Sequence, residues 1–434
     1  MKKIFITLLI IGRAIPGVFA QSNATSFDVD GIKVIFKPTV KEIVNVRMFY
    51  RGGVTNYPAS QAGIESFALE ATTECGTKKY TGNVFRDRAD KYSIDIGSEA
   101  EYDYGDIEMD CAKKYFNEGW DLFAEAINNP VFEANEVELL RNKIIGKIRS
   151  EQSDPDKRSE QLILKNAFDG TPYATDPNGD DNIIAKLTPA NLKAYYASIF
   201  NKNQVFIVVA GKISKEELIA KIKATFAAMP ARSYTPPVYH TPVWNDYKVL
   251  SEGRDLATNY INAIMNSPAV NSPDYVAYRI GVSGLGGTLF SSLRTKLNLS
   301  YDPGASSVMG QMPYSLMFVS TTKPKEAVDV MVNELNRVRS NGLTDEGLVN
   351  LKSGYITNNY IKQQSTAAIT GSLGIAEVLG GWQLSDQLPE MISKVTVDQI
   401  DKAMNKYIVG LRWSYLGSPA LGNQAADSFK KPVK

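Results

Sequence analysis

Residues 52–77, GGVTNYPASQAGIESFALEATTECGT, decide the fold of this chain. Ser60 is a candidate N-cap, and the pattern after it predicts a helix over residues 60–74. Upstream, residues 31–38 (GIKVIFKP) and 44–50 (VNVRMFY) are rich in β-branched and aromatic side chains, which predicts a hairpin-like pair of strands. Strands followed by a helix indicate the beginning of an α+β pattern.

Downstream of this stretch, helices alternate with a buried strand. Hydrophobic periodicity predicts a strand over residues 204–210 and helices over residues 115–127, 135–152, 188–200 and 214–226. The second of these helices is expected to end before Asp154 and Pro155, because the residue before a proline avoids the helical conformation.

The second half of the chain repeats the order of the first at an offset of ~210 residues. In each half an amphipathic helix leads through an acidic turn into another helix, within residues 115–152 and from residue 327 onward. In each half a threonine, Thr188 or Thr396, introduces a helix that leads to a strand-like segment. This self-similarity predicts two homologous domains.

Three boundaries divide the chain. Residues 1–20 predict a signal peptide, because Lys2 and Lys3 precede an apolar run that ends in the small residue Ala20. The mature chain is expected to begin at Gln21. The remaining boundaries are an N-terminal domain over residues 21–230, a proline-containing linker over residues 231–246, and a C-terminal domain over residues 247–434.

Composition and charge exclude several classes of protein. The 434 residues are 44% hydrophobic and 22% charged, which is usual for a globular protein and too apolar for a disordered one. A formal charge of +1 gives no argument for a nucleic-acid partner. No segment after the signal peptide is long and apolar enough to cross a membrane. We therefore expect a soluble, exported protein in the periplasm or another extracytoplasmic space.

Few residues offer metal-binding or disulfide chemistry. His240 is the only histidine, and Cys75 and Cys111 are the only cysteines. Export permits a disulfide. A chain of this size does not need one, so a disulfide and two separately buried thiols both stay open.

Four segments carry a resemblance to a known family. They are residues 63–77 (GIESFALEATTECGT), 143–155 (KIIGKIRSEQSDP), 187–200 (LTPANLKAYYASIF) and 204–214 (QVFIVVAGKIS). In this order they resemble the pitrilysin/insulinase-type zinc peptidases of the half-length, two-domain kind, over essentially the whole mature chain. The resemblance implies two homologous α+β domains, each an antiparallel-rich sheet packed with helices, and a peptide chamber between paired halves.

The zinc ligands of the active family members are missing here. The resemblance implies an H-x-x-E-H motif, in which two histidines hold zinc and the glutamate activates the bound water. Alignment on the following Gly-Thr pair puts Phe67 and Ala71 in place of the histidines. The resemblance implies a third ligand, a glutamate about eight residues before an Asp-Pro pair, and Asp154-Pro155 puts Lys147 there. Catalytic zinc needs about three His, Asp, Glu or Cys ligands. We therefore expect no metal in this chain and no hydrolysis by this chain alone.

Glu70 stands at the position of the water-activating glutamate. One interpretation is that it still contacts a substrate or partner. The other is that it is a relic on a helix, paired with Lys147. Glu74 lies four residues further on, and a solvated helix face explains the two carboxylates better than a cation site does.

The second half preserves more of the family pattern. Residues 286–301, GGTLFSSLRTKLNLSY, resemble a stretch in which an arginine and a tyrosine reach a bound peptide, and these correspond to Arg294 and Tyr301. Arginine can bind a peptide carbonyl, and a tyrosine hydroxyl can stabilise an oxyanion. Asn298 replaces the usual glycine and tolerates a left-handed backbone. The structural alternative is a helix-end arginine packed on a core tyrosine.

A glycine cluster precedes this stretch at Gly281, Gly284, Gly286 and Gly287. It lacks the Lys-Ser/Thr of a phosphate-binding P-loop. The resemblance implies a flexible lip, formed by Gly284, Gly286 and Gly287, that lets a peptide backbone approach. A simple turn and helix entry is the alternative.

These features imply a catalytically deficient subunit of a heterodimeric zinc peptidase. A homologous partner would carry H-x-x-E-H and the zinc, and this chain would supply Arg294 and Tyr301 for peptide hydrolysis. A noncatalytic peptide-binding or structural assembly module is the alternative. A metallopeptidase with an unrecognised site is a third possibility.

Overall fold

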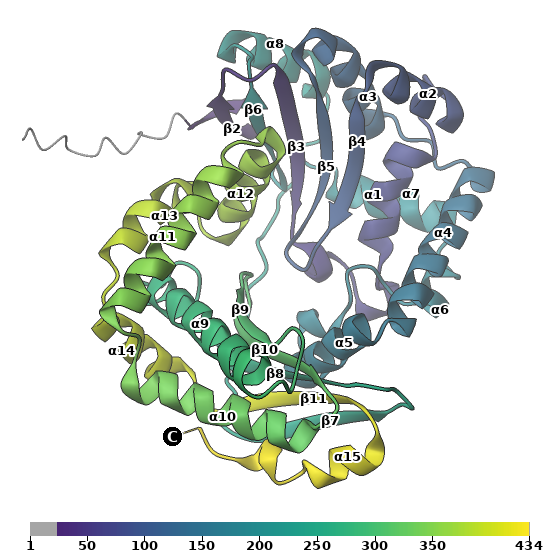
Figure 1. Cartoon of the computed structure of the whole chain (residues 1–434). Helices are drawn as coiled ribbons and strands as arrows, with labels where there is room; N and C mark the ends of the chain where they lie inside the picture. The colour runs from purple at the N-terminus through teal and green to yellow at the C-terminus, as the bar shows by residue number, and fades with distance from the viewer. Residues whose placement is uncertain (1–23, 434) are drawn as a thin grey trace, which may run out of the picture.

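Two β-sheets and their flanking helices make up the fold, which a computed structural model describes for residues 24–433 (Figure 1). The predicted signal peptide lies outside these residues. The α+β fold class is confirmed. None of the described helices is long and apolar enough to cross a membrane.

The first sheet has six strands in the order β1-β2-β6-β3-β5-β4. Only the pair β2 and β6 is parallel, and the other neighbours are antiparallel. The strands are β1 (Thr25–Val29), β2 (Ile32–Pro38), β3 (Ile43–Arg51), β4 (Asp95–Ala100), β5 (Tyr104–Ala112) and β6 (Val205–Gly211).

The prediction that residues 31–38 and 44–50 pair as a hairpin is wrong. β6 lies between β2 and β3, parallel to the first and antiparallel to the second. Every residue of β6 is buried, so both faces of this strand need cover, which favours a central place in the sheet. Local periodicity cannot identify this neighbour, because β6 comes from a distant part of the chain.

The second sheet has five strands in the order β7-β11-β8-β10-β9. This order matches that of β2, β6, β3, β5 and β4 in the first sheet. Among the five matched strands of each sheet, the two parallel neighbours are the first and the last along the chain, which are β2 with β6 and β7 with β11. The strands are β7 (Tyr247–Gly253), β8 (Asn259–Asn266), β9 (Gly304–Val308), β10 (Tyr314–Thr321) and β11 (Leu411–Gly417).

Helices accompany each sheet. Those of the first half are α1 (Ile64–Glu74), α2 (Gly82–Tyr92), α3 (Phe116–Asn128), α4 (Ala134–Ser153), α5 (Pro155–Phe168), α6 (Asp181–Ile184), α7 (Pro189–Ile199) and α8 (Lys215–Phe226). Those of the second half are α9 (Tyr275–Leu289), α10 (Pro324–Asn341), α11 (Asp345–Lys362), α12 (Thr366–Leu379), α13 (Gln383–Lys394), α14 (Val397–Tyr407) and α15 (Pro419–Gln424). A π-helix, η5 (Phe290–Lys296), continues α9. The helices expected from periodicity correspond to α3, α4, α7 and α8.

The helix predicted from residue 60 begins later than expected. Residues 59–61 form a separate 3-10 turn, and Ser60 does not cap α1. The N-cap is Gly63, at φ 84°, a left-handed conformation that glycine adopts readily. The other end of the helical region follows the prediction, since α4 ends at Ser153 and Asp154 caps α5.

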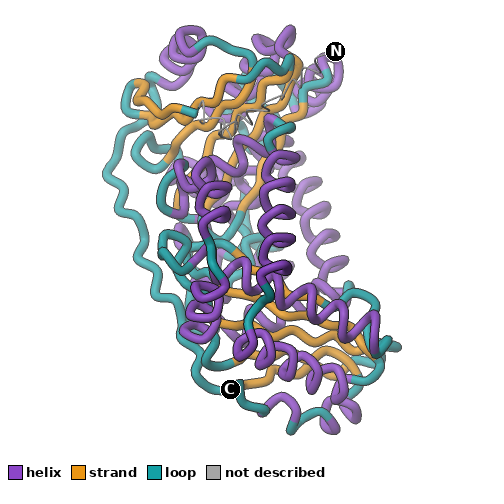
Figure 2. The backbone as a smooth tube through the Cα atoms, turned by 60° about the vertical axis from the view of Figure 1, so that its left-hand side comes forward, coloured by secondary structure: helices purple, strands orange, loops and turns teal. Residues whose placement is uncertain are grey.

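The same cap appears at the same place in both halves. Thr188 opens α7 with a capping box in which Asn191 returns the hydrogen bond, and Thr396 opens α14 with Gln399 in that role. Between the two sheets, residues 231–246 contain no helix or strand. Figure 2 shows a long loop running along one side of the molecule from one sheet to the other. The exact domain boundaries stay a prediction.

Each sheet is covered on one face by a helix from the other half of the chain. α12 packs on β3 and β6, where Leu373 and Ile369 share a core with Phe49 and Phe206. α5 packs on β8 and β11, where Asn166 Nδ2 donates to the Trp413 carbonyl at 2.8 Å. Figure 1 shows α12 against the first sheet and α5 beside the second. The two halves therefore share their cores.

Candidate functional site

The positions aligned with zinc-binding histidines are part of the hydrophobic core. Phe67 and Ala71, both on α1, are fully buried. The guanidinium of Arg141, on α4, lies 5.4 Å from the centre of the Phe67 ring and donates to the Ile184 carbonyl at 2.5 Å. These side chains join α1 to α4 by packing and a cation–π contact rather than through a shared ion.

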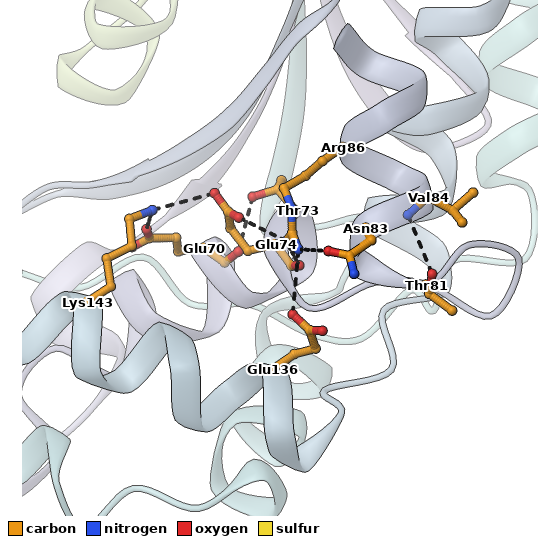
Figure 3. Close-up of polar contacts among 9 residues, drawn as sticks. All are labelled: Glu70, Thr73, Glu74, Thr81, Asn83, Val84, Arg86, Glu136 and Lys143. Atoms are coloured by element: carbon orange, nitrogen blue, oxygen red, sulfur yellow. Dashed lines mark hydrogen bonds and ion pairs between the residues drawn. The ribbon is translucent and has the colours of Figure 1, made fainter. Parts of the chain in front are cut away.

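Glu70 and Glu74 are neutralised by cations from neighbouring helices (Figure 3). Lys143 Nζ, on α4, lies 2.9 Å from Glu70 and 3.5 Å from Glu74. Arg86, on α2, lies 3.3 Å from Glu74 and 3.8 Å from Glu136. The hydrogen bond to Glu70 raises the pKa of Lys143. Two cations therefore face the three carboxylates of this network.

The suggested pairing of Glu70 with Lys147 is wrong, because Glu70 pairs with Lys143. Lys147 lies one helical turn beyond Lys143 and instead approaches Glu151, at 4.0 Å. The i, i+4 spacing of the two lysines puts both on the same face of α4. The sequence prediction missed Lys143 because the alignment considered only the position of Lys147. The i, i+4 spacing of the two lysines could have indicated Lys143 as a second candidate partner of Glu70.

The aligned positions do not fit zinc. Their side chains are an aromatic ring, a methyl group and an ammonium, and none of these is a zinc ligand. Within residues 24–433, no group of three or more His, Cys, Asp or Glu side chains is arranged to hold a metal ion. Zinc chemistry is therefore not assigned to this chain.

A cavity of about 760 Å³ lies beside Glu70. It is bounded by α1, α4, α5 and the end of β4, the last strand at one edge of the first sheet. Its carboxylates outnumber its cations, and they include Glu101 and Asp176. Burial, with the nearby charges of Glu99, Asp103 and Asp176, raises the pKa of Glu101 to about 7. This cavity carries negative charge next to a sheet edge that no other described strand covers.

A carboxylate that sequence analysis missed is buried beneath the same helix. Glu65, on α1, is fully buried, and its Oε2 accepts hydrogen bonds from Tyr195 and, at 3.1 Å, from Asn56. Burial raises its pKa to about 7, and the two hydrogen bonds oppose this only in part. No local pattern identifies such a residue, because Tyr195 lies in a distant part of the chain.

Arg294 and Tyr301 lie in contact with each other at the end of η5. The Arg294 guanidinium is 3.8 Å from the centre of the Tyr301 ring, and Nη1 donates to the Tyr301 carbonyl. Tyr301 is 78% exposed. Asn298 has φ 50°, which confirms the expected left-handed backbone at that position. The alternative of a buried core tyrosine does not hold for this residue.

The Arg294 and Tyr301 pair lines a different cavity from the one beside Glu70. This second cavity, of about 560 Å³, shares no lining residue with the first. The structure therefore brings Arg294 and Tyr301 together and leaves both apart from Glu70 and Lys147.

The expected glycine-rich lip is a helix. Gly281, Gly284, Gly286 and Gly287 all lie within α9. A side chain on Gly286 would put its Cβ 2.8 Å from the Ala305 carbonyl of β9, and one on Gly284 would meet Leu343 at 2.6 Å. Gly281, Gly284 and Gly286 allow close packing of α9, whereas Gly287 faces open space. Because all four lie in a helix rather than a loop, the flexible-lip prediction is wrong.

Cys75 and Cys111 are both buried and free, so the structure contains two separate thiols at these positions. Burial raises the pKa of each thiol to about 12. A thiolate is the reactive form of cysteine, so neither residue is prepared for nucleophilic chemistry.

Comparison with known proteins identifies the family. The model of insulinase, peptidase family M16, matches residues 33–178, and the model of the peptidase M16 inactive domain matches residues 186–355. The chain belongs to peptidase family M16. Its matches include the inactive domain of the family and a non-peptidase homolog, and the positions that the resemblance aligns with zinc ligands hold Phe67, Ala71 and Lys147.

Relatives of this M16 chain include proteins with and without assigned peptidase activity. It is 22% identical over 306 residues to the non-peptidase homolog YmxG of Helicobacter pylori, with 69% of each chain covered. The structure of a protease from Helicobacter pylori is similar with a TM-score of 0.85 at 16% identity, covering 92% of this chain and 100% of that one. The first half of the periplasmic protease PqqL from Escherichia coli gives 0.76 at 19% identity, covering 94% and 96%. At these identities, the structural likeness shows the fold alone.

Proposed function

We propose that this chain is the zinc-less subunit of a heterodimeric zinc peptidase. A homologous partner that carries H-x-x-E-H would hold the zinc and the water-activating glutamate. This chain would supply Arg294 and Tyr301 to the bound peptide. The observation that carries the proposal is a contrast between two places in the molecule. On α1, the positions aligned with zinc-binding histidines hold the buried Phe67 and Ala71, whereas the Arg294 and Tyr301 pair is accessible to solvent.

The substrate would be an extended peptide. β4 pairs only with β5 among the described strands, so its other edge can accept main-chain hydrogen bonds. Ser98, Glu99 and Ala100 of this strand border the cavity of about 760 Å³. Main-chain hydrogen bonds provide affinity without requiring one peptide sequence. The compartment would be the periplasm, as the N-terminal pattern of residues 1–20 suggests.

The roles of Arg294 and Tyr301 follow from their chemistry. Arg294 would donate to a peptide carbonyl, because a guanidinium presents several N–H groups in a fixed plane. The exposed Tyr301 hydroxyl would donate to the oxyanion that forms when water attacks that carbonyl. Both residues would act across the subunit interface on a peptide held by the partner's zinc.

Two experiments test this proposal in sequence. The tagged chain is captured from the periplasm of its source, and the captured proteins are identified by mass spectrometry while zinc is assayed. We expect a stoichiometric partner with H-x-x-E-H and about one zinc per heterodimer. In the reconstituted complex, Arg294→Gln should abolish most of the turnover and leave assembly intact, whereas Lys296→Gln, two residues away, should change neither.

A noncatalytic peptide-binding or structural assembly module is the second candidate. The similarity to the non-peptidase homolog YmxG favours it. A zinc-free monomer or homodimer in the capture experiment would support this candidate. Unchanged turnover of a complex with Arg294→Gln would also reject the role of an assisting subunit.

A further inference from the structure

The cavity next to Arg294 has an unusual set of side chains. Seven of its ten lining residues carry a hydroxyl group, one is the cation Arg294, and none is a carboxylate. The nearest carboxylate along the chain, Asp302, does not line the cavity. This composition contrasts with the acidic cavity beside Glu70, and hydroxyl groups with a guanidinium donate well to an oxyanion.

One of these hydroxyls is buried without a partner. Ser300 is 9% exposed, and its Oγ makes no hydrogen bond within the described part of the chain. Buried polar groups in folded proteins almost always have a partner, and Ser300 belongs to the residues that line this cavity. An acceptor bound in the cavity would give its hydroxyl that partner.

Arg294 is held in place before any ligand binds. Its guanidinium stacks on the Tyr301 ring, and a single described hydrogen bond uses Nη1, which leaves further donors for a ligand. The π-helix below it is fixed to α10, since Ser292 Oγ donates to Glu334 at 2.7 Å. A guanidinium fixed in this way loses little conformational freedom when it binds a carboxylate.

We propose that this cavity binds the C-terminal carboxylate of a peptide, the group that hydrolysis leaves in place of the cleaved carbonyl, so that the new C-terminus keeps its contact with Arg294 after cleavage. The single cation matches one negative charge, which favours a carboxylate over the more highly charged phosphate. A volume of about 560 Å³ also exceeds the space of a single ion and can hold the last residues of a chain. The ligand class rests on the proposed function, in that the ligand is a peptide. The binding itself requires no partner subunit.

Fluorescence anisotropy with the purified chain tests this assignment. The probes are an uncharged hexapeptide with an N-terminal fluorophore and either a free C-terminal carboxylate or a C-terminal amide. The acid should bind about tenfold more tightly than the amide, because charge-assisted hydrogen bonds to the guanidinium exist only for the acid. Equal affinities for the two peptides would overturn the proposal.

Variants assign the preference to this cavity. Arg294→Gln should bring the acid-to-amide ratio close to one, and Ser300→Ala should weaken the acid severalfold without changing the amide. Lys296→Gln, an exposed cation outside the cavity, should keep the ratio of the unchanged chain. Arg294→Lys keeps the positive charge but loses the paired N–H donors of the guanidinium, so we expect an intermediate acid-to-amide ratio. This variant provides the test if Arg294→Gln does not fold. A ratio that survives both substitutions of Arg294 would contradict the proposal.

Inorganic phosphate distinguishes a terminal carboxylate from a free ion. Millimolar phosphate should leave the acid peptide bound, and full displacement at that concentration would show that the cavity is a phosphate site instead. The outcome is separable from the proposed function. An acid preference in a chain without a zinc-bearing partner would keep this inference and reject the heterodimer. If Arg294→Gln loses turnover in the complex but the unchanged chain shows no preference for the acid peptide, the heterodimer is kept and this inference is rejected.

Discussion

The helices α1 and α9 occupy equivalent places in the two halves, and they use their polar residues in opposite ways. On α1, Phe67 and Ala71 are buried in the core, and Glu70 is paired with Lys143 at 2.9 Å. On the continuation of α9, Tyr301 is 78% exposed and Arg294 lines an open cavity. The first repeat buries or pairs these side chains, whereas the second leaves Arg294 and Tyr301 at the edge of a cavity.

The largest expected difference between the two halves is catalytic. In the reconstituted complex, Tyr301→Phe should lower kcat by roughly a hundredfold, because removal of one oxyanion donor typically has an effect of this size. Glu70→Gln should change kcat by less than about twofold, because without a metal the carboxylate activates no water. Steady-state kinetics measures kcat for both variants. Comparable losses would show that Glu70, in the first half, also takes part in catalysis.

The second prediction concerns the stability of the first half as a function of pH. Folding raises the pKa of Glu65 from 4.5 to about 7, so the folded state binds the proton more tightly than the unfolded state. This contribution is complete below pH 4.5 and is lost as the pH rises through 7. Relative to Glu65→Gln, the unchanged chain should therefore lose roughly 2 kcal/mol of unfolding free energy between pH 5 and pH 8.

Urea denaturation of both proteins at the two pH values measures this difference. Because Asp106 is present in both chains, its own raised pKa cancels in the comparison. A difference in stability that is the same at pH 5 and pH 8 would mean that Glu65 does not titrate on folding in this range.

The third prediction concerns the ion pair between Lys143 and Glu70 in the first half. Lys143→Met should destabilise the fold by about 0.5–1 kcal/mol, a small value because the lysine side chain is 63% exposed. The double variant with Glu70→Gln should recover part of this loss, as a thermal denaturation cycle would show. The matched control, Lys296→Met, should have no measurable effect. If the control loses as much stability as Lys143→Met, the loss cannot be attributed to the ion pair.

The smallest expected effect is that of the metal. Added zinc, or a chelator, should leave the Tm of the isolated chain within about 1 °C, because an ion that does not bind the folded state cannot stabilise it. A rise of several degrees with one zinc bound per chain would reveal a metal site that the described residues do not show.

Helices and their ends were largely predictable because their signals are local. The α4 helix ends where Pro155 requires it, and Thr188 and Thr396 cap their helices as the repeat suggests. The left-handed Asn298 was also predictable, because short polar side chains tolerate that conformation. The error at Ser60 is local too, since Gly63, three residues further on, begins the helix.

The candidate site was predictable only in part. The contact between Arg294 and Tyr301 spans seven residues, and the resemblance named both. The partner of Glu70 came out as Lys143 instead of Lys147, because two lysines on one helix face compete and only the packing of α4 on α1 decides between them. The glycines of α9 misled the prediction because close packing and flexibility favour the same residue.

The sequence by itself determined the α+β pattern and its repetition, because these depend on residue identity and on spacing within a few turns. Tertiary structure alone placed β6 between β2 and β3 and exchanged α5 and α12 between the two sheets. Periodicity records that a side chain is buried, but not which distant apolar surface covers it, because many surfaces satisfy the same hydrophobic pattern. For that reason, the core that the two halves share and the separation of the two cavities became visible only in the folded chain.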